Sequence, residues 1–304
     1  MANQLLDVFC VADMCVDLVL AGDVRPQFHQ IEQLIDNYTL ELGGSANIFA
    51  TQFAKLGGRA GVAGWIGSDI LGEFVLRRLQ ILGVETKHVH QQDSFKTGLG
   101  LALAERDDRA ILTYLGTIDA FEPQGLTEEL LGVARHWHIA SYFLLGKLRD
   151  CWKIWLDRCR TAGVTTSLDT NWDPENRWEG VVDLLPQVDV FFPNESEARA
   201  IARESDVMTA GKRLACYGSL VVIKLGSEGA VAFKGNKCWR SGEAESAVAI
   251  VDTIGAGDNF DAGFLRAWLL GREVDECLDL ASRCATSSLR AAGGIEGQLR
   301  ETIA

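Results

Sequence analysis

Proline and basic residues are scarce in this chain of 304 residues. It holds 5 prolines against 31 glycines, and 29 Lys and Arg against 42 Asp and Glu. Few prolines with many glycines suit tight junctions between strands and helices better than a proline-punctuated β-sandwich. The formal net charge of −13 repels a phosphate backbone, which argues against a nucleic-acid partner. A phosphate ligand would therefore have to be held locally, by backbone amides and a few placed cations.

Several sequence signals are absent. No apolar run approaches the roughly 18 residues of a transmembrane helix, and the first apolar stretch contains Asp7 and Asp13, unlike a secretory leader. The eight cysteines include no Cys-x-x-Cys pair, which predicts a reduced, cytoplasmic protein. There is no P-loop, and no Gly-x-Gly-x-x-Gly follows the first strand, which argues against a dehydrogenase.

Strand and helix patterns alternate along most of the chain. Such strand–helix–strand units build a parallel sheet, which predicts an α/β fold. The predicted strands cover residues 7–12, 59–66, 137–140, 165–169, 188–192 and 219–224. The predicted helices cover residues 45–56, 68–82, 148–162, 195–204, 258–270 and 273–292.

Residues 97–105 and 110–115 depart from this alternation. They form a strand pair around a polar turn at 106–109, typical of a hairpin. We expect segments 13–42 and 95–118 to pair as a small β-sheet lid. The second half has too few strands for a domain of its own, so residues 1–304 are expected to form one domain with this lid.

The segment from Asp252 to Phe260 reads Asp-Thr-Ile-Gly-Ala-Gly-Asp-Asn-Phe. It predicts a glycine-rich turn that opens a helix near Asp258. Gly255 and Gly257 have no side chains, so an anion can approach the unpaired amides at the positive end of the helix. Asp258 would lie beside that anion as a potential general base. The alternative is an Asp that only caps the helix after a tight turn.

Asn194 and Glu197 lie three residues apart at the start of a predicted helix, after a buried strand. The spacing places both side chains on one face of the first turn. An Asn amide can donate to phosphate, and a Glu can hold magnesium directly or through water. The alternative is a capping box with no ligand.

Four segments together resemble the ribokinase-like (PfkB-type) carbohydrate kinases. The Asp252–Phe260 segment resembles the C-terminal signature of that family, and Gly43-Gly44-Ser45-Ala46-Asn47 with residues 64–72 resembles the N-terminal one. Residues 194–197 resemble its Asn-x-x-Glu motif, and residues 224–229 resemble its nucleotide loop. The resemblance extends over residues 5–298.

The resemblance implies a doubly wound, three-layer α/β/α sandwich with a small β-sheet lid. It implies transfer of the γ-phosphoryl group of ATP to a hydroxyl of a small carbohydrate, a phosphotransferase reaction with an alcohol acceptor. Asp258 matches the catalytic base of the family. The amides of Gly255, Ala256 and Gly257 match its anion hole.

The resemblance also implies ATP and Mg²⁺ as cofactors. The nucleotide positions it assigns are Asn194, Lys224, Gly226, Gly229 and Thr253. Glu197 matches the magnesium position. Family members often hold a monovalent cation such as potassium between the loop at 293–294 and the backbone near Asp252.

For the sugar, the resemblance assigns Asp17, Gly43, Gly44, Asn47 and Asp258. The chain departs from ribokinases at Ala12, at Cys15 and at residues 141–143, where a sugar-contacting Glu is missing. These departures argue against ribose in particular. The roles of residues 169–174 and of Arg109 stay open, since 169–174 resemble a fructokinase-like segment near the phosphates but also suit an Asx-turn exit loop.

Two other functions remain open. A nucleoside kinase of the same fold would stack a base on aromatic residues, for which Tyr38, Phe95 and Phe121 are the nearby candidates. A non-catalytic protein that binds sugar or nucleotide is the other alternative, and the intact Gly-Ala-Gly-Asp turn argues against it. The exposed edge of the lid could pair with a second copy as a homodimer.

Overall fold

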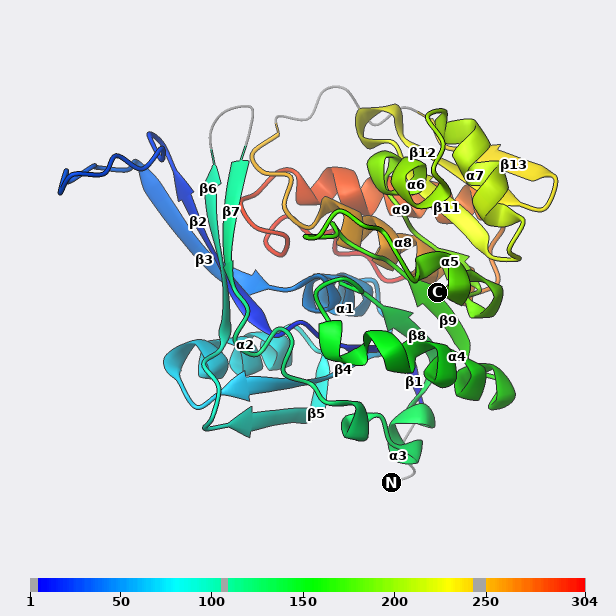
Figure 1. Ribbon diagram of the computed structural model, residues 1–304, viewed down its shortest axis with the longest axis horizontal. Coiled ribbons are helices and arrows are strands. Elements are labelled where there is room, and N and C mark those ends of the chain that lie inside the picture. The colour runs from blue at the N-terminus through cyan, green and yellow to red at the C-terminus, as the bar shows by residue number, and fades with distance from the viewer. Residues whose placement is uncertain (1–4, 105–108, 243–249, 304) are drawn as a thin grey trace.

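A nine-stranded sheet forms the centre of the computed structural model, which describes residues 5–104, 109–242 and 250–303 (Figure 1). Its strand order is β13-β12-β11-β10-β9-β8-β1-β4-β5. Neighbouring strands are parallel except at β11–β12 and β12–β13. The strands are β1 (Leu6–Val11), β4 (Ala60–Gly67), β5 (Glu85–Gln92), β8 (Ala134–Ile139), β9 (Thr165–Leu168), β10 (Val190–Phe191), β11 (Leu220–Lys224), β12 (Ala230–Lys234) and β13 (Lys237–Arg240).

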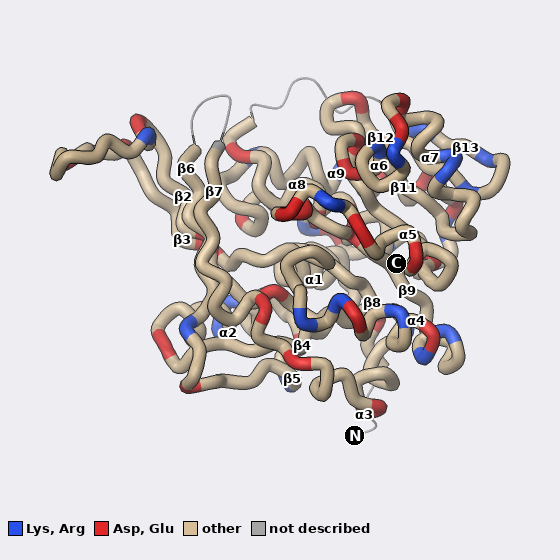
Figure 2. Tube along the Cα trace, viewed as in Figure 1, with Lys and Arg blue, Asp and Glu red and all other residues tan. Residues whose placement is uncertain are grey.

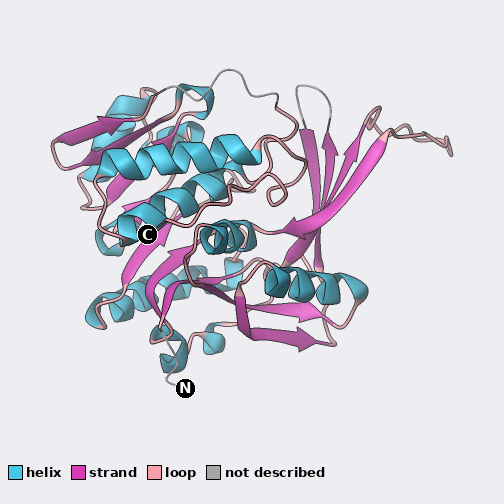
Figure 3. Ribbon diagram, turned by 180° about the vertical axis from the view of Figure 1, so that it is seen from behind, coloured by secondary structure: helices cyan, strands magenta, loops and turns pink. Residues whose placement is uncertain are grey.

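Helices cover both faces of this sheet, as Figure 3 shows from behind. Strand β1 explains why: Val8 and Cys10 belong to one buried core, and Phe9 and Val11 belong to the other. A strand buried on both faces is apolar along most of its length, unlike one with a solvated face. One core is covered by α1 (Ser45–Lys55), α2 (Ile70–Ile81), α8 (Ala256–Leu269) and α9 (Val274–Ser288). The other is covered by α3 (Glu128–Leu131), α4 (Trp152–Thr161), α5 (Val181–Leu184), α6 (Glu195–Ala202) and α7 (Val207–Ala215).

A second sheet of four strands stands to one side of this sandwich (Figure 1). Its order is β3 (Asn37–Gly43), β2 (Cys15–Ala21), β6 (Gly98–Ala104) and β7 (Arg109–Tyr114). Strands β2 and β6 are parallel, while the two outer pairs are antiparallel. The α/β/α sandwich with a small β-sheet lid is thereby confirmed, and the lid strands come from both of the predicted segments.

The structure also differs from the sequence patterns. The predicted helix at 148–162 begins as a 3-10 helix, Gly146–Cys151, and becomes α-helical at Trp152. The edge strand β5 was not predicted, because its sequence ETKHVHQQ is polar and partly exposed. Of the predicted turn at 106–109, residues 106–108 lie outside the described residues. The side chain of Arg109 lies outside them too.

Candidate active site

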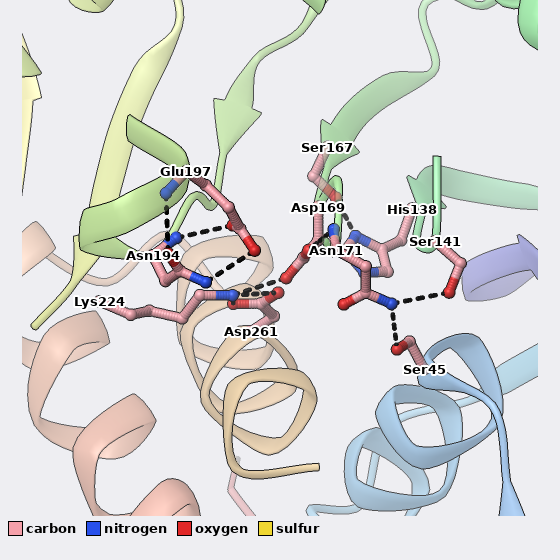
Figure 4. Close-up of polar contacts among 10 residues, drawn as sticks. All are labelled: Ser45, His138, Ser141, Ser167, Asp169, Asn171, Asn194, Glu197, Lys224 and Asp261. Carbon is pink, nitrogen blue, oxygen red and sulfur yellow. Dashed lines mark hydrogen bonds and ion pairs between the residues drawn. The ribbon is translucent and has the colours of Figure 1, made fainter. Parts of the chain in front are cut away.

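The carboxyl ends of five strands meet at one edge of the large sheet. Strands β1, β8, β9 and β10 are followed by Asp13, Ser141, Asp169 and Asn194 respectively, and β11 ends at Lys224. Strand β1 lies between β8 and β4, so the chain winds in opposite directions on its two sides. A crevice opens at such a switch point in open α/β sheets, and ligands bind there. Figure 4 shows the side chains that converge at this edge.

The glycine-rich turn enters this edge from helix α8. Gly255 is the N-cap residue with φ of 71°, and the helix begins at Ala256. A Cβ atom at Gly255 would lie 2.9 Å from the Cα atom of Gly294, so only glycine fits this close approach. The Asn259 amide fixes the turn by donating to the carbonyl oxygens of Gly255 (2.8 Å) and Gly294 (2.9 Å). Gly255, the N-cap residue, has no side chain to cap the first-turn amides of α8, which leaves that end of the helix suited to an anion.

Asp258 lies in the first turn of α8 and is buried. Burial, together with the nearby charge of Asp169, raises the pKa of the Asp258 carboxyl well above its usual range. The ammonium of Lys224 and a hydrogen bond from Ser45 act in the opposite direction. A carboxyl group with a raised pKa in a crevice suits proton transfer near neutral pH.

Lys224 lies beneath the turn between two carboxylates. Its Nζ is 2.6 Å from Oδ2 of Asp169 and 3.2 Å from Oδ1 of Asp261. It is also 3.4 Å from the position that a Cβ atom of Gly257 would take, so its charge lies next to the turn. Burial disfavours the ammonium, but attraction to both carboxylates outweighs burial and raises the Lys224 pKa. Burial would raise the pKa of Asp169, but the charge of Lys224 outweighs it and lowers that pKa to about 2. At Asp261 the effect of burial is the larger one, and it raises the pKa well above its usual range.

Asn194 and Glu197 form a complete capping box. The Glu197 amide donates to Oδ1 of Asn194 (2.9 Å), and the Asn194 amide donates to Oε2 of Glu197 (2.8 Å). The Asn194 side-chain amide also donates to Oε1 of Glu197 (2.7 Å). Burial and the charge of Asp169 raise the pKa of Glu197 to about 7. A β-bridge joins Asn194 to Lys224, so the box adjoins the turn, and its predicted nucleotide and magnesium roles stay predictions.

The remaining nucleotide positions follow Lys224 and precede α8. Gly226 and Gly229 both have positive φ, 62° and 83°, and bracket a short 3-10 helix, Gly226–Glu228. A Cβ atom at Gly229 would lie 2.3 Å from the carbonyl oxygen of Gly242, so glycine is required there for packing alone. The backbone carbonyl of Thr253 accepts from Ala256 (3.4 Å). Asp252 ties the two loops expected to hold a monovalent cation, because its carboxylate accepts from the amides of Ile254 and Gly293.

A second group of predicted residues lies at the base of the small sheet. A Cβ atom at Gly43 or at Gly100 would lie within 2.6 Å of the Asp17 carboxylate, so both glycines leave room for it. The Asn47 side-chain amide donates to the carbonyl oxygen of Gly43 (2.9 Å). Its buried Oδ1 has no partner among the described residues, which suits a donor from a ligand. Gly44, with φ of 87°, passes so close to Asp13 that a Cβ atom would lie 2.2 Å from its carbonyl oxygen.

Sequence reasoning missed Asp13 as a site residue. Its carboxylate accepts from the amides of Ser45 (3.0 Å) and Ala46 (3.1 Å), and so caps α1 in place of Gly44, which has no side chain. It also accepts from the hydroxyl of Ser141 (2.7 Å). A polar residue directly after the first strand was the available signal, because the carboxyl ends of parallel strands share one edge.

Asp261 was missed as well, although it follows Asp258 by three residues and therefore shares its helix face. No group of three or more His, Cys, Asp or Glu among the described residues could hold a metal ion. Mg²⁺ bound through nucleotide phosphates needs only one or two protein carboxylates, so Glu197 remains compatible with the predicted magnesium position.

The fold is an α/β/α sandwich with a small β-sheet lid, and this edge joins a glycine-rich turn to a buried carboxyl group. The pfkB family carbohydrate kinase description matches residues 5–301. The chain therefore belongs to the pfkB family of carbohydrate kinases and is a phosphotransferase with an alcohol group as acceptor. No helix within the described ranges is long and apolar enough to cross a bilayer.

Named relatives cover nearly the whole chain. It is 27% identical to the ATP-dependent 6-phosphofructokinase of Thermoanaerobacterium thermosaccharolyticum over 297 residues, 95% of this chain and 89% of that protein. It is also 27% identical to the fructoselysine 6-kinase of Escherichia coli over 285 residues, 92% and 96% of the two chains. A solved structure of a putative ribokinase II of E. coli with ATP and Mg²⁺ superposes with a TM-score of 0.86 at 22% identity, covering 97% and 96% of the two chains.

Proposed function

We propose that this kinase transfers the γ-phosphoryl group of ATP to a hydroxyl of a small carbohydrate, with Asp258 as the general base. The observation that carries the proposal is the buried Asp258 carboxyl in the first turn of α8, directly after the Gly255–Gly257 turn and close to Lys224. In this arrangement a proton acceptor adjoins a site for the negative charge that moves during transfer.

The proposed mechanism assigns one task to each part of the site. Asp258 accepts the proton of the acceptor hydroxyl, which makes the oxygen a better nucleophile. The amides of Gly255, Ala256 and Gly257 donate to the oxygens of the transferred group, and Lys224 supplies positive charge beneath the turn. Positioning and electrostatics of this kind account for most of phosphoryl-transfer catalysis.

The nucleotide side of the proposed site comprises Asn194, Lys224, Gly226, Gly229 and Thr253. Glu197 is the proposed magnesium residue, directly or through water. When bound, Mg²⁺ neutralises charge on the phosphate oxygens. A monovalent cation such as potassium is proposed near Asp252, where the carboxylate already joins the two loops.

The acceptor side comprises Asp17, Gly43, Gly44 and Asn47. Carboxylate and amide oxygens accept hydrogen bonds from sugar hydroxyls. The relatives named above include kinases of a fructose phosphate and of fructoselysine, both derivatives of a keto-sugar. A primary hydroxyl of a keto-sugar is therefore the proposed acceptor.

An acceptor panel tests this proposal. Release of ADP is measured with sugars and nucleosides, with and without potassium, for the parent, for Asp258→Asn, and for Asp275→Asn, which changes an exposed carboxylate in α9. We expect turnover with a sugar, a loss of at least about 100-fold in Asp258→Asn, and parental turnover in Asp275→Asn. Substantial activity of Asp258→Asn contradicts the mechanism. Turnover with nucleosides alone supports the nucleoside kinase, and binding without turnover supports the non-catalytic protein.

The small sheet is proposed to act as a lid on one kinase domain and to carry a homodimer contact. Charged residues are few on its four strands, as Figure 2 shows. Its face opposite Asp17 is apolar, and four of its side chains are exposed: Tyr38, Leu40, Leu112 and Tyr114. A second copy could cover this face. Sedimentation should then show a dimer that Leu112→Glu dissociates, and a monomeric parent would contradict the proposal.

The proposed location is the cytoplasm. All eight cysteines are free thiols in the structure, and four of them are fully buried. Free thiols of this number are typical of a reducing compartment. Fractionation of cells that produce the protein would test the location.

A further inference from the structure

Asn171 connects two carboxylates through two serines. Its side-chain nitrogen Nδ2 is 2.6 Å from the hydroxyl oxygen of Ser45 and 2.9 Å from that of Ser141 (Figure 4). The Ser141 hydroxyl donates to Asp13 (2.7 Å), and the Ser45 hydroxyl interacts with the carboxyl group of Asp258. These contacts bring together residues that follow β1, β8 and β9 and residues at the starts of α1 and α8.

The chemistry of the groups fixes the direction of these hydrogen bonds. An amide nitrogen carries two hydrogens, and each of them is donated to one serine oxygen. A serine that accepts in this way keeps its own hydrogen for another partner. For Ser141 that partner is Asp13, and for Ser45 it is Asp258. Asn171 therefore orients both hydroxyl hydrogens toward carboxylates.

The backbone supports this interpretation. Asn171 has φ of 54° and Ser141 has φ of 55°, in the left-handed region that residues other than glycine seldom adopt. Such a conformation persists where surrounding contacts impose it, often at functional sites. The Asn171 amide is held by Oδ1 of Asp169 (2.8 Å), the same carboxylate that holds Lys224 through Oδ2.

We propose that Asn171 is a positioning residue that directs the Ser45 hydroxyl onto Asp258 and so holds the base in the orientation that accepts the proton. The proposal rests on the proposed function, in which Asp258 is that base. A carboxylate has two oxygens, so a donor on one can fix the group while the other faces the acceptor. Removal of the donor leaves the carboxylate less stabilised, and its pKa should rise.

Three variants test the proposal. Asn171→Gly removes the amide and suits the positive φ, Ser45→Ala removes the hydroxyl, and the double variant removes both. Asn176→Gly is the matched control, because Asn176 has φ of 58° in the same loop and is exposed. The titratable groups with a direct effect on Asp258, namely Asp13, Asp169, Lys224 and Asp261, stay in place in every variant.

The primary measurement is a ¹³C NMR titration of protein labelled at aspartate Cγ, with the Asp258 signal assigned by its absence in Asp258→Asn. We expect the Asp258 midpoint to rise by about half a pH unit or more in Asn171→Gly and in Ser45→Ala. The Asp258 midpoint of the double variant should rise no further than that of Ser45→Ala, because Asn171 acts through Ser45. Asn176→Gly should titrate like the parent.

The second measurement is the pH dependence of kcat/KM with ATP and the sugar that the parent turns over fastest. Its acidic limb should move to higher pH in the same two variants. The proposal is overturned if the Asp258 midpoint in Asn171→Gly equals that of the parent. It is also overturned if Asn171→Gly shifts this midpoint as much in the Ser45→Ala background as in the parent. Activity of Asp258→Asn would instead refute the proposed function, and the NMR titration would still decide whether Asn171 acts on Asp258.

Discussion

The two glycines of the turn before α8 should respond differently to alanine. At Gly255 the added methyl group meets Cα of Gly294 at 2.9 Å and two side-chain carbons of Ile48 at 3.0 Å. Alanine must also adopt φ of 71°, which costs about 1–2 kcal/mol. Crowding of this kind adds about 1–3 kcal/mol. Gly255→Ala should therefore lower the free energy of unfolding by about 2–5 kcal/mol, or Tm by roughly 4–10 °C in a chain of this size.

Gly257 lacks both penalties. It lies inside α8 and outside the positive-φ region, and the nearest atoms to its added methyl are Nζ, Cε and Cδ of Lys224 at 3.4, 3.8 and 3.9 Å. Alanine favours a helix over glycine by up to about 1 kcal/mol, so Tm should stay level or rise slightly. The methyl group would lie beside Lys224, next to the amides that are proposed to bind the phosphoryl group. Loss of one such anion contact lowers kcat by about 100-fold or more.

The assay pairs thermal unfolding with turnover of the best acceptor sugar for both variants. We expect a large loss of Tm in Gly255→Ala alone, and a large loss of kcat at parental Tm in Gly257→Ala. A Gly255→Ala protein that melts like the parent would refute the conformational argument. A Gly257→Ala protein with full kcat would refute the assignment of the anion site.

Three further predictions concern stability and binding. Asp261→Asn should gain stability relative to the parent as pH rises above about 4, the usual pKa of an Asp in the unfolded chain, because the raised native pKa keeps the buried carboxyl protonated while the unfolded chain releases its proton. Thermal unfolding from about pH 4 upward measures this gain, and a pH-independent difference would contradict it. Phe264→Ala should cost about 3–5 kcal/mol in urea unfolding, because its side chain is fully buried in the core under α8, and a loss below 1 kcal/mol would contradict the packing. Asn194→Ala should cost about 1 kcal/mol through the lost cap and should also raise KM for ATP if the amide binds phosphate, so an unchanged KM leaves the residue a cap only.

Much of the architecture could be predicted because buried apolar residues recur along the sequence with the period of a helix or a strand. Helices α1, α2, α6 and α8 begin within about two residues of their predicted starts, and both lid segments contain the strands of the small sheet. The edge strand β5 could not be predicted, because its position in the sheet comes from hydrogen bonds to β4 and its side chains are polar. Pairing of β2 with β6 in parallel also depends on strands far apart in the chain.

The candidate site was predictable where one short segment carries several of its groups. The turn at 252–258 contains both the amides proposed to bind the anion and the carboxyl group proposed as the base, so this prediction needed only neighbours along the chain. The capping box at Asn194 and Glu197 shows the limit of such patterns, since both predicted alternatives use the same two residues.

The sequence by itself determined the α/β class, the scarcity of basic charge and the Gly-Ala-Gly-Asp turn, because these depend on composition and on neighbours along the chain. Tertiary structure alone decided that Lys224 lies between Asp169 and Asp261, and that Asn171 reaches Ser45 and Ser141. The physical reason is that the carboxyl ends of parallel strands converge at one edge of the sheet, which brings together side chains more than a hundred residues apart. The proposed phosphate site at this edge consists of helix amides and one buried lysine, Lys224, which lies between two acidic side chains.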